Sequence, residues 1–122
     1  MGKASVLIAE DNADTRSLLH LLLENEGFEV FEAEDGASAL QFLTRHHPDA
    51  IVTDLMMPLV GGIGLIQRLR RRAEFADTPI IAISAFAREY SPDPIMAGAT
   101  AVLRKPEDLL QVAETLNRLL NL

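Results

Sequence analysis

The chain contains no cysteine and no tryptophan, and aromatic residues make up only 5% of its 122 residues. Without cysteine it can have no disulfides, no thiolate catalysis and no cysteine-ligated metal site. The lack of disulfides is also typical of proteins that stay in the cytoplasm, where we expect this one. The scarcity of aromatic side chains argues against a surface that stacks on nucleic-acid bases.

Positive charge and long apolar runs are scarce as well. Lysine and arginine number 11 against 18 aspartate and glutamate residues, so the formal net charge is −7 and the surface repels nucleic acid. No apolar run approaches the roughly 20 residues that a membrane-spanning helix needs. We therefore expect no nucleic-acid or membrane partner, and the length fits a single domain over residues 1–122.

Short apolar runs alternate with amphipathic stretches along the chain. Four of the runs are rich in β-branched residues and favour strands that are covered on both faces, as in a parallel sheet. A fifth run alternates apolar and charged residues, which favours a strand at the sheet edge. The expected strands are residues 5–9, 28–32 (the edge strand), 50–53, 79–83 and 101–103.

The stretches between these runs carry apolar residues at helical spacing, and Asn12 and Asp35 are suited to cap two of the helices. The fourth stretch contains Pro92 and Pro94, so we expect that helix to be short, late-starting or irregular. Repeated alternation of strand and helix predicts a doubly wound α/β fold with right-handed crossovers. The expected helices are residues 13–26, 36–47, 62–75, 88–98 and 107–120.

Polar residues follow the apolar runs where the strands end. In an open α/β sheet, ligands bind outside the carboxyl ends of the strands. Glu10 and Asp11 follow the first run, Asp54 the third, Ser84 the fourth and Lys105 the fifth. We therefore expect three carboxylates, a hydroxyl and an ammonium at one edge of the sheet.

Carboxylates gathered in this way repel one another unless a cation lies between them. Oxygen ligands alone indicate Mg²⁺, or Mn²⁺ in its place. The metal and Lys105 would together neutralise a phosphoryl group, to which a hydroxyl such as that of Ser84 donates. A central carboxylate can itself act as the nucleophile.

The set Glu10-Asp11, Asp54-Leu55-Met56-Met57-Pro58, Ser84-Ala85 and Lys105-Pro106 resembles the receiver domain of two-component response regulators, of the chemotaxis-regulator kind, over essentially the whole chain. The resemblance implies a flavodoxin-like, five-stranded parallel sheet with strand order 2-1-3-4-5. It also implies a signalling switch without its own output domain. Such a switch takes a phosphoryl group from a sensor histidine kinase or phosphotransfer protein and then binds an output protein, here unknown. Beyond catalysing its own phosphorylation and dephosphorylation it would not be an enzyme, and we expect a monomer or weak dimer.

The resemblance assigns the metal site to four residues. Asp54 would be both phospho-acceptor and metal ligand. Asp11 would bind the metal directly, and Glu10 directly or through water. Met56 would contribute its backbone carbonyl.

On the phosphoryl side, the resemblance makes Ser84 the hydroxyl that donates to the phosphoryl group in the active state. Lys105 would pair with Asp54 and then with the phosphate. Pro106 would follow a cis peptide bond. Met56 and Phe86 flank the expected path of the hydrolytic water, and both are apolar, so we expect slow loss of the phosphoryl group.

Two positions depart from the usual pattern of the family. Val102 stands where receivers usually have a tyrosine or phenylalanine, which moves inward with the switch serine. A short β-branched side chain cannot make that movement, so we expect Ser84 to signal through an ordering change over residues 86–98. Gly61 replaces an aspartate that would cap the third helix.

Among the alternatives, the sequence argues against a phosphatase and an electron carrier and leaves the others open. Each motif alone has an ordinary explanation as a strand end, a turn or a helix start. A haloacid-dehalogenase-type phosphatase would need a second aspartate where Met56 stands, and a flavodoxin-like electron carrier would need a glycine- and hydroxyl-rich loop at residues 10–12. A receiver that keeps the fold but has lost phosphorylation is a further alternative, and the chain could be a stand-alone regulator or part of a larger protein.

The remaining polar clusters receive ordinary interpretations. Leu69-Arg70-Arg71-Arg72 is expected to face the helix dipole and solvent, with partner docking as the alternative. His46 and His47 are expected at a solvated helix end, and His20 is given no role.

Overall fold

The computed structural model describes residues 2–85 and 93–122. Five parallel strands form one sheet in the order β2-β1-β3-β4-β5, which confirms the predicted fold class and strand order. The strands are β1 (Ser5–Ala9), β2 (Glu29–Ala33), β3 (Ala50–Asp54), β4 (Ile80–Ser84) and β5 (Ala101–Arg104).

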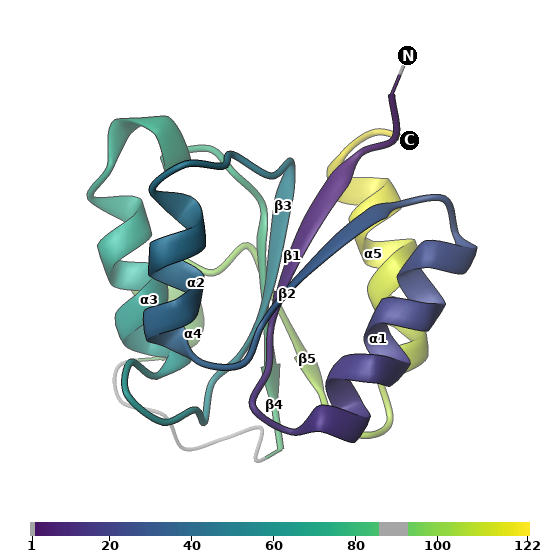
Figure 1. Cartoon of the computed structure of the whole chain (residues 1–122), viewed down its shortest axis with the longest axis horizontal. Coiled ribbons are helices and arrows are strands. Elements are labelled where there is room, and N and C mark those ends of the chain that lie inside the picture. The colour runs from purple at the N-terminus through teal and green to yellow at the C-terminus, as the bar shows by residue number, and fades with distance from the viewer. Residues whose placement is uncertain (1, 86–92) are drawn as a thin grey trace.

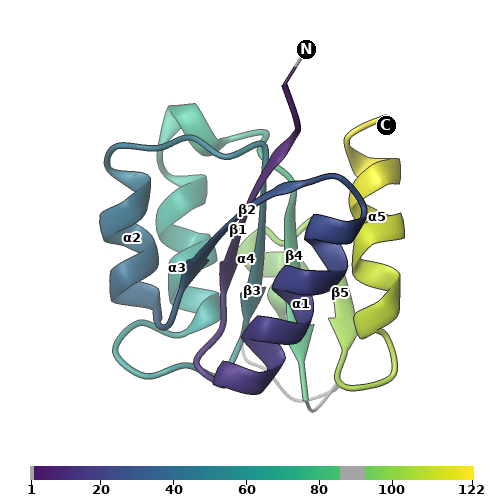
Figure 2. The ribbon, with the colours of Figure 1, turned by 45° about the vertical axis from the view of Figure 1, so that its right-hand side comes forward.

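Helices cover both faces of the sheet. Figure 1 shows α1 and α5 on one face and α2, α3 and α4 on the other, and Figure 2 shows the same three layers from a second side. No helix in the described parts of the chain has the length and apolarity needed to cross a membrane. The helices are α1 (Ala13–Asn25), α2 (Gly36–Leu43), α3 (Gly62–Arg70), α4 (Pro94–Ala97) and α5 (Val112–Leu119), with short 3₁₀ helices at Ala73–Phe75 and Leu109–Gln111.

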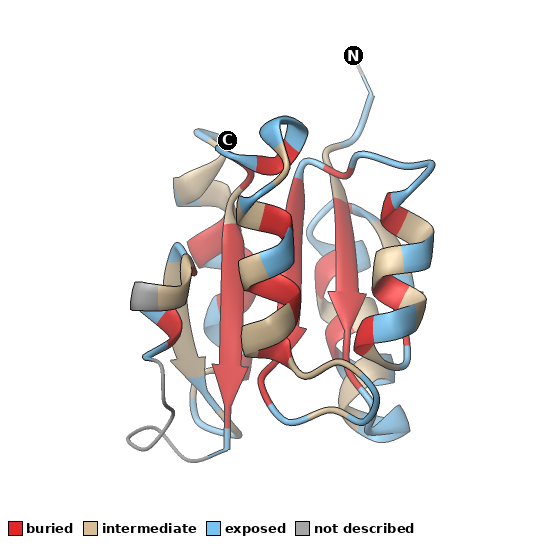
Figure 3. Ribbon diagram, turned by 90° about the vertical axis from the view of Figure 1, so that its left-hand side faces the viewer, coloured by how far each residue is buried: buried red, intermediate tan, exposed pale blue. Residues whose placement is uncertain are grey.

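The three central strands are buried along almost their whole length (Figure 3). Successive strand residues point to opposite faces, so Leu7 joins the core beneath α2 and α3, whereas Ile8 joins the core beneath α1 and α5. Burial on both faces explains why these strands read as continuous apolar runs. The strands β2 and β5 lie at the two edges and are less buried; the alternating sequence predicts this for β2, whereas β5 was expected to be covered on both faces.

Three helices are shorter than predicted. The helix α2 ends at Leu43 rather than at residue 47, and α3 ends at Arg70, followed by a separate 3₁₀ turn. The helix α5 begins at Val112 rather than at residue 107. The side chain of Asp108 accepts a hydrogen bond from the Arg104 amide at 2.9 Å, which closes a turn after β5 instead of capping the helix.

The fourth helix is short and starts late, as the prolines predict. Pro94 occupies its first turn, where a missing amide proton costs no helical hydrogen bond. Asp93 caps it by accepting a hydrogen bond from the Ile95 amide at 2.8 Å. Pro92 and Phe86 lie outside the described residues.

Candidate functional site

The carboxyl ends of β1 and β3 bring three carboxylates together. Glu10 and Asp11 directly follow β1, and Asp54 is the last residue of β3; one oxygen of each lies within 4.8 Å of the others. Glu10 and Asp54 are buried, with exposed fractions of 1% and 4%, whereas Asp11 is exposed. The convergence predicted from strand order is therefore present, at the lower end of the sheet in Figure 1.

The ends of β4 and β5 add a hydroxyl and an ammonium. Ser84 is buried at the end of β4, and its carbonyl accepts a hydrogen bond from the Lys105 amide at 2.8 Å. The ammonium of Lys105 lies 2.7 Å from Glu10 Oε1 and 3.1 Å from Asp54 Oδ2. The peptide bond between Lys105 and Pro106 is cis, as the resemblance implied.

Asn12 fixes the loop that carries two of the carboxylates. Its amide donates to Glu10 Oε2 at 3.0 Å, and its side chain accepts from the Thr15 amide at 2.9 Å as the cap of α1. The predicted cap is confirmed, and the same residue also holds the Glu10 carboxylate.

A second loop leads from Asp54 into α3. The Met56 amide donates to Asp54 Oδ1 at 3.2 Å, while the Met56 side chain is exposed. The role of the Met56 carbonyl as a metal ligand stays a prediction. A side chain at Gly62 would place its Cβ 2.3 Å from the Asp54 carbonyl oxygen, so only glycine allows α3 to start this close to the site. Gly61 makes no side-chain cap, as predicted.

The site holds more negative charge than its ammonium can balance. Burial raises the pKa of Glu10 to about 7; Asp54 adds to this rise, and Lys105 and the Asn12 amide oppose it. Burial also lowers the pKa of Lys105, but its two carboxylate partners outweigh burial and the net pKa is raised. The buried Glu10 Oε1 contacts the Lys105 ammonium, which Asp54 shares, and has no second partner among the described residues. An oxygen of this kind, beside two more carboxylates, fits a hard divalent cation such as Mg²⁺.

Comparison with known proteins assigns the family. The sequence model of the response regulator receiver domain matches residues 6–117. The chain belongs to this family. It is 34% identical over 113 residues to the polar-differentiation response regulator DivK of Brucella ovis, with 92% of each chain covered.

Solved receiver structures have the same fold. The receiver domain of a sensor histidine kinase from Pseudomonas aeruginosa, solved with a magnesium ion in its active site cleft, superposes with a TM-score of 0.90 at 25% identity, covering 99% of this chain and all of that one. The chemotaxis response regulator CheY4 of Vibrio cholerae gives a TM-score of 0.84 at 28% identity, covering 96% and 98% of the two chains. The chain is therefore a receiver domain of two-component signalling.

Val102 occupies the position where the resemblance leads us to expect a tyrosine or phenylalanine. The side chain is half-buried on β5, opposite Ala82 of β4, and packs against the core beneath α3. The expected ordering change over residues 86–98 stays a prediction, because residues 86–92 lie outside the described part of the chain.

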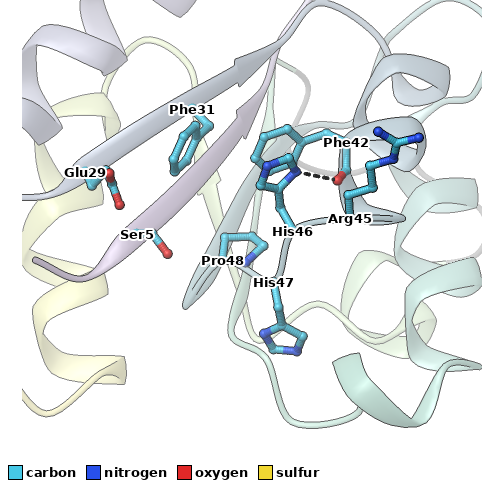
Figure 4. Close-up of a pocket in the computed structure, with 8 residues that line it drawn as sticks. All are labelled: Ser5, Glu29, Phe31, Phe42, Arg45, His46, His47 and Pro48. Atoms are coloured by element: carbon cyan, nitrogen blue, oxygen red, sulfur yellow. Dashed lines mark hydrogen bonds between the residues drawn. The ribbon is translucent and has the colours of Figure 1, made fainter. Parts of the chain in front are cut away.

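The two adjacent histidines are exposed, as predicted, and lie just after the end of α2 at Leu43. A hollow of about 310 Å³ lies at the amino ends of β1 and β2, and Figure 4 shows Phe31, Phe42 and His46 among the residues that line it. The His46 ring stacks on Phe42 with centroids 4.1 Å apart, and the His47 ring stacks on Phe75 at 4.7 Å. His47 Nε2 also bonds to the carbonyl of Glu74. Each histidine therefore packs one face of its ring on a phenylalanine while it stays exposed to solvent.

Arg70 is a structural residue that sequence reasoning missed. Its guanidinium donates to the carbonyls of Phe75 and Thr78, each at 2.7 Å, and of Gly98 at 2.9 Å. It thus ties the end of α3 to the segments before β4 and β5. The available signal was spacing, since Arg70 follows the buried Ile66 by four residues and therefore shares its face of the helix.

Proposed function

We propose that this receiver domain is switched by phosphorylation of Asp54, and that the phosphoryl group comes from a phosphohistidine of a sensor histidine kinase or phosphotransfer protein. The observation that carries the proposal is the position of Asp54. Its carboxylate is buried at the end of β3, hydrogen-bonded on one oxygen to Lys105 and on the other to the Met56 amide. Both donors hold the nucleophile in place.

In the reaction, a carboxylate oxygen of Asp54 forms a bond to phosphorus while the phosphorus–nitrogen bond of the donor breaks. The imidazole leaves with the electron pair of that bond and takes up a proton, and the product is an acyl phosphate. Lys105 neutralises charge on the transferred group, since its ammonium already lies within 3.1 Å of the acceptor. Ser84 is positioned at the neighbouring strand end to donate its hydroxyl to the same group.

The residues that would hold Mg²⁺ are Glu10, Asp11 and Asp54, with the Met56 carbonyl as a further ligand. When bound, the ion neutralises the carboxylates and the phosphoryl oxygens. Mn²⁺ has the same preference for oxygen ligands and would replace it. The Pseudomonas receiver with magnesium in its cleft supports this part of the proposal.

We also propose that the protein acts in the cytoplasm by changing a protein-binding surface. The net charge of −7 argues against nucleic acid as the direct target. Apart from its own phosphorylation and dephosphorylation, this receiver catalyses no reaction in our proposal.

The test is phosphorylation by a panel of purified phosphohistidine donors in the presence of Mg²⁺, followed by mapping of the modified residue. The expected result is one phosphoryl group on Asp54, no incorporation in Asp54→Asn, and normal incorporation in Asp77→Asn, an exposed control. Undiminished incorporation in Asp54→Asn would overturn the proposal. No incorporation from any donor, nor from a small acyl phosphate, would favour a receiver that has lost phosphorylation.

A further inference from the structure

Arg16 of α1 makes an unusual contact beside the site. Its side chain is only 18% exposed, and Nη1 donates to the backbone carbonyl of Glu10 at 2.7 Å. That carbonyl belongs to the peptide group that joins Glu10 to Asp11. A charged side chain of α1 is therefore hydrogen-bonded to the backbone between two expected metal ligands.

The guanidinium is held in turn by a chain of ion pairs that runs across to β2. Arg16 Nε lies 3.5 Å from Glu32 Oε1, and the other oxygen of Glu32 lies 2.6 Å from His20 Nδ1. His20 Nε2 contacts Glu24 Oε2 at 3.3 Å. The register of β2 against β1 sets Glu32 opposite Ile8, two residues before Glu10, which brings its carboxylate to this end of the sheet.

The orientation of the peptide group between Glu10 and Asp11 sets the position of the exposed Asp11 carboxylate. The Glu10 amide is bound to the Ala33 carbonyl at 3.0 Å, and the Asn12 amide to the Glu10 carboxylate. Arg16 supplies the bond to the carbonyl between them. Without that bond the peptide group can rotate, and the Asp11 carboxylate moves with it.

We propose that Arg16 is a positioning residue for the metal site, held in place by Glu32, and that it sets the Mg²⁺ affinity by fixing the peptide group between Glu10 and Asp11. This inference rests on the proposed function only in assigning the site to Mg²⁺. It does not require that Asp54 be phosphorylated.

The test compares Mg²⁺ dissociation constants, measured by isothermal titration calorimetry, in matched variants. Arg16→Lys keeps the charge but cannot span the Glu10 carbonyl and Glu32 together. Groups that orient metal ligands change affinity by about 10- to 100-fold when mutated, and for this backbone contact we expect about tenfold weakening. Arg68→Lys, an exposed arginine on α3, is expected to bind as the parent does.

Two further variants separate positioning from charge. Glu32→Gln removes the ion pair that aims Arg16, so it should weaken Mg²⁺ binding by a smaller factor than Arg16→Lys. The double variant should be no weaker than Arg16→Lys alone, because Glu32 acts through Arg16. Additive losses, or weaker binding in Glu32→Gln with none in Arg16→Lys, would mean that charge near the site sets the affinity, and the proposal would be overturned.

A second measurement does not depend on the metal. Amide hydrogen exchange of Asp11 and Asn12 in metal-free protein should become faster in Arg16→Lys, while the amides of β4 and β5 keep their parental rates. At saturating Mg²⁺ the phosphorylation rate should return to the parental value, so that only the Mg²⁺ concentration for half-maximal rate changes. Unchanged exchange at Asp11 and Asn12, or an unchanged Mg²⁺ dissociation constant, would overturn the proposal. A failure of Asp54 phosphorylation would leave it standing.

Discussion

The two ends of the sheet differ in how their polar side chains are balanced. At the carboxyl ends of the strands, three carboxylates lie together, and two of them, Glu10 and Asp54, share the single ammonium of Lys105. At the amino ends, His46 and His47 stack on phenylalanine rings, and Asp49 accepts hydrogen bonds from the amide and hydroxyl of Ser5. Hollows of similar size lie at both ends, about 310 Å³ at the amino end and about 280 Å³ beside Arg16 and Glu32 at the carboxyl end, but the unbalanced charge lies at the carboxyl end. In this molecule, unbalanced charge distinguishes the candidate functional site, whereas the presence of a hollow does not.

The largest difference between the two ends is expected when one aspartate at each end is replaced by alanine. Asp11→Ala should reduce Mg²⁺-dependent phosphorylation by on the order of 100-fold. In metal-free buffer it should leave the free energy of unfolding unchanged or higher, since mutually repelling carboxylates are relieved. Asp49→Ala should do the reverse, with normal phosphorylation and a loss of about 1 kcal/mol of stability. Urea unfolding and phosphorylation assays check both. A clear loss of stability in Asp11→Ala would show a structural role for that residue.

The cation of Arg70 is bound by backbone carbonyls, whereas the cation of Lys105 is bound by carboxylates. Replacing it by alanine leaves several carbonyls without their donor, so Arg70→Ala should lower the free energy of unfolding by about 2–4 kcal/mol. Mg²⁺ affinity should stay unchanged, because Arg70 lies away from the carboxylates. The exposed Arg71→Ala is the control and should lose less than about 0.5 kcal/mol. Parental stability in Arg70→Ala would contradict the structural role.

The raised pKa of Glu10 makes the carboxyl end sensitive to pH. Between its ordinary value of 4.5 and about 7, the folded metal-free protein binds a proton that the unfolded chain has released. Its stability should therefore fall as pH rises through this window. Mg²⁺ needs the ionised form, so its affinity should rise over the same window. Chemical denaturation with and without Mg²⁺ checks the sign, and Glu10→Gln should flatten both trends. A metal-free stability that rises with pH in parent and Glu10→Gln alike would contradict this assignment.

His20 gives a smaller pH effect, and its pKa is raised by carboxylate partners rather than by burial. Burial lowers its pKa, but the carboxylates of Glu32 and Glu24 outweigh burial, and the net pKa is raised. The stabilisation is fully present below pH 6.5, the ordinary pKa, and is lost as pH rises through the raised value. For this half-exposed cluster, which also includes Arg16, we expect less than about 1 kcal/mol. NMR titration of the His20 ring in the parent and in Glu32→Gln checks it; the same pKa in both would contradict the ion pair.

The smallest effect is expected at the stacked rings. His46→Ala removes the stack on Phe42 and the tilted contact with Phe31, and should cost about 0.5–1 kcal/mol of stability. It should change neither Mg²⁺ affinity nor phosphorylation, because the hollow lies at the far end of the sheet. A change in either would show that the amino end is coupled to the site.

The strands and the site could be predicted from the sequence because they depend on local features. A strand buried on both faces must be apolar throughout, and parallel strands necessarily end at one edge. The positions of Glu10, Asp54 and Lys105 follow from these two facts alone. The late start of α4 was likewise readable from Pro94, which cannot occupy a helix interior.

The features that sequence reasoning missed depend on contacts between distant segments. The helix expected from residue 107 starts only at Val112, because the Asp108 carboxylate closes a turn onto the Arg104 amide. Arg70 looked like one of several exposed arginines, yet it binds the Gly98 carbonyl, 28 residues away. Arg16 gave no signal, because its partners Glu10 and Glu32 come together only when β2 pairs with β1.

The most direct test of the account is amide hydrogen exchange with and without Mg²⁺ and beryllofluoride, a phosphoryl mimic. If the carboxyl end is an incomplete site, the added charge should slow exchange at residues 10–12, at Met56 and at Lys105. It should also change exchange over residues 86–98, as expected if Ser84 signals through that segment. The amino end, from Arg45 to Asp49, should keep its rates. Unchanged exchange at residues 10–12 and at Met56, or protection confined to the amino end, would contradict the central claim that the unbalanced carboxylates form the switch.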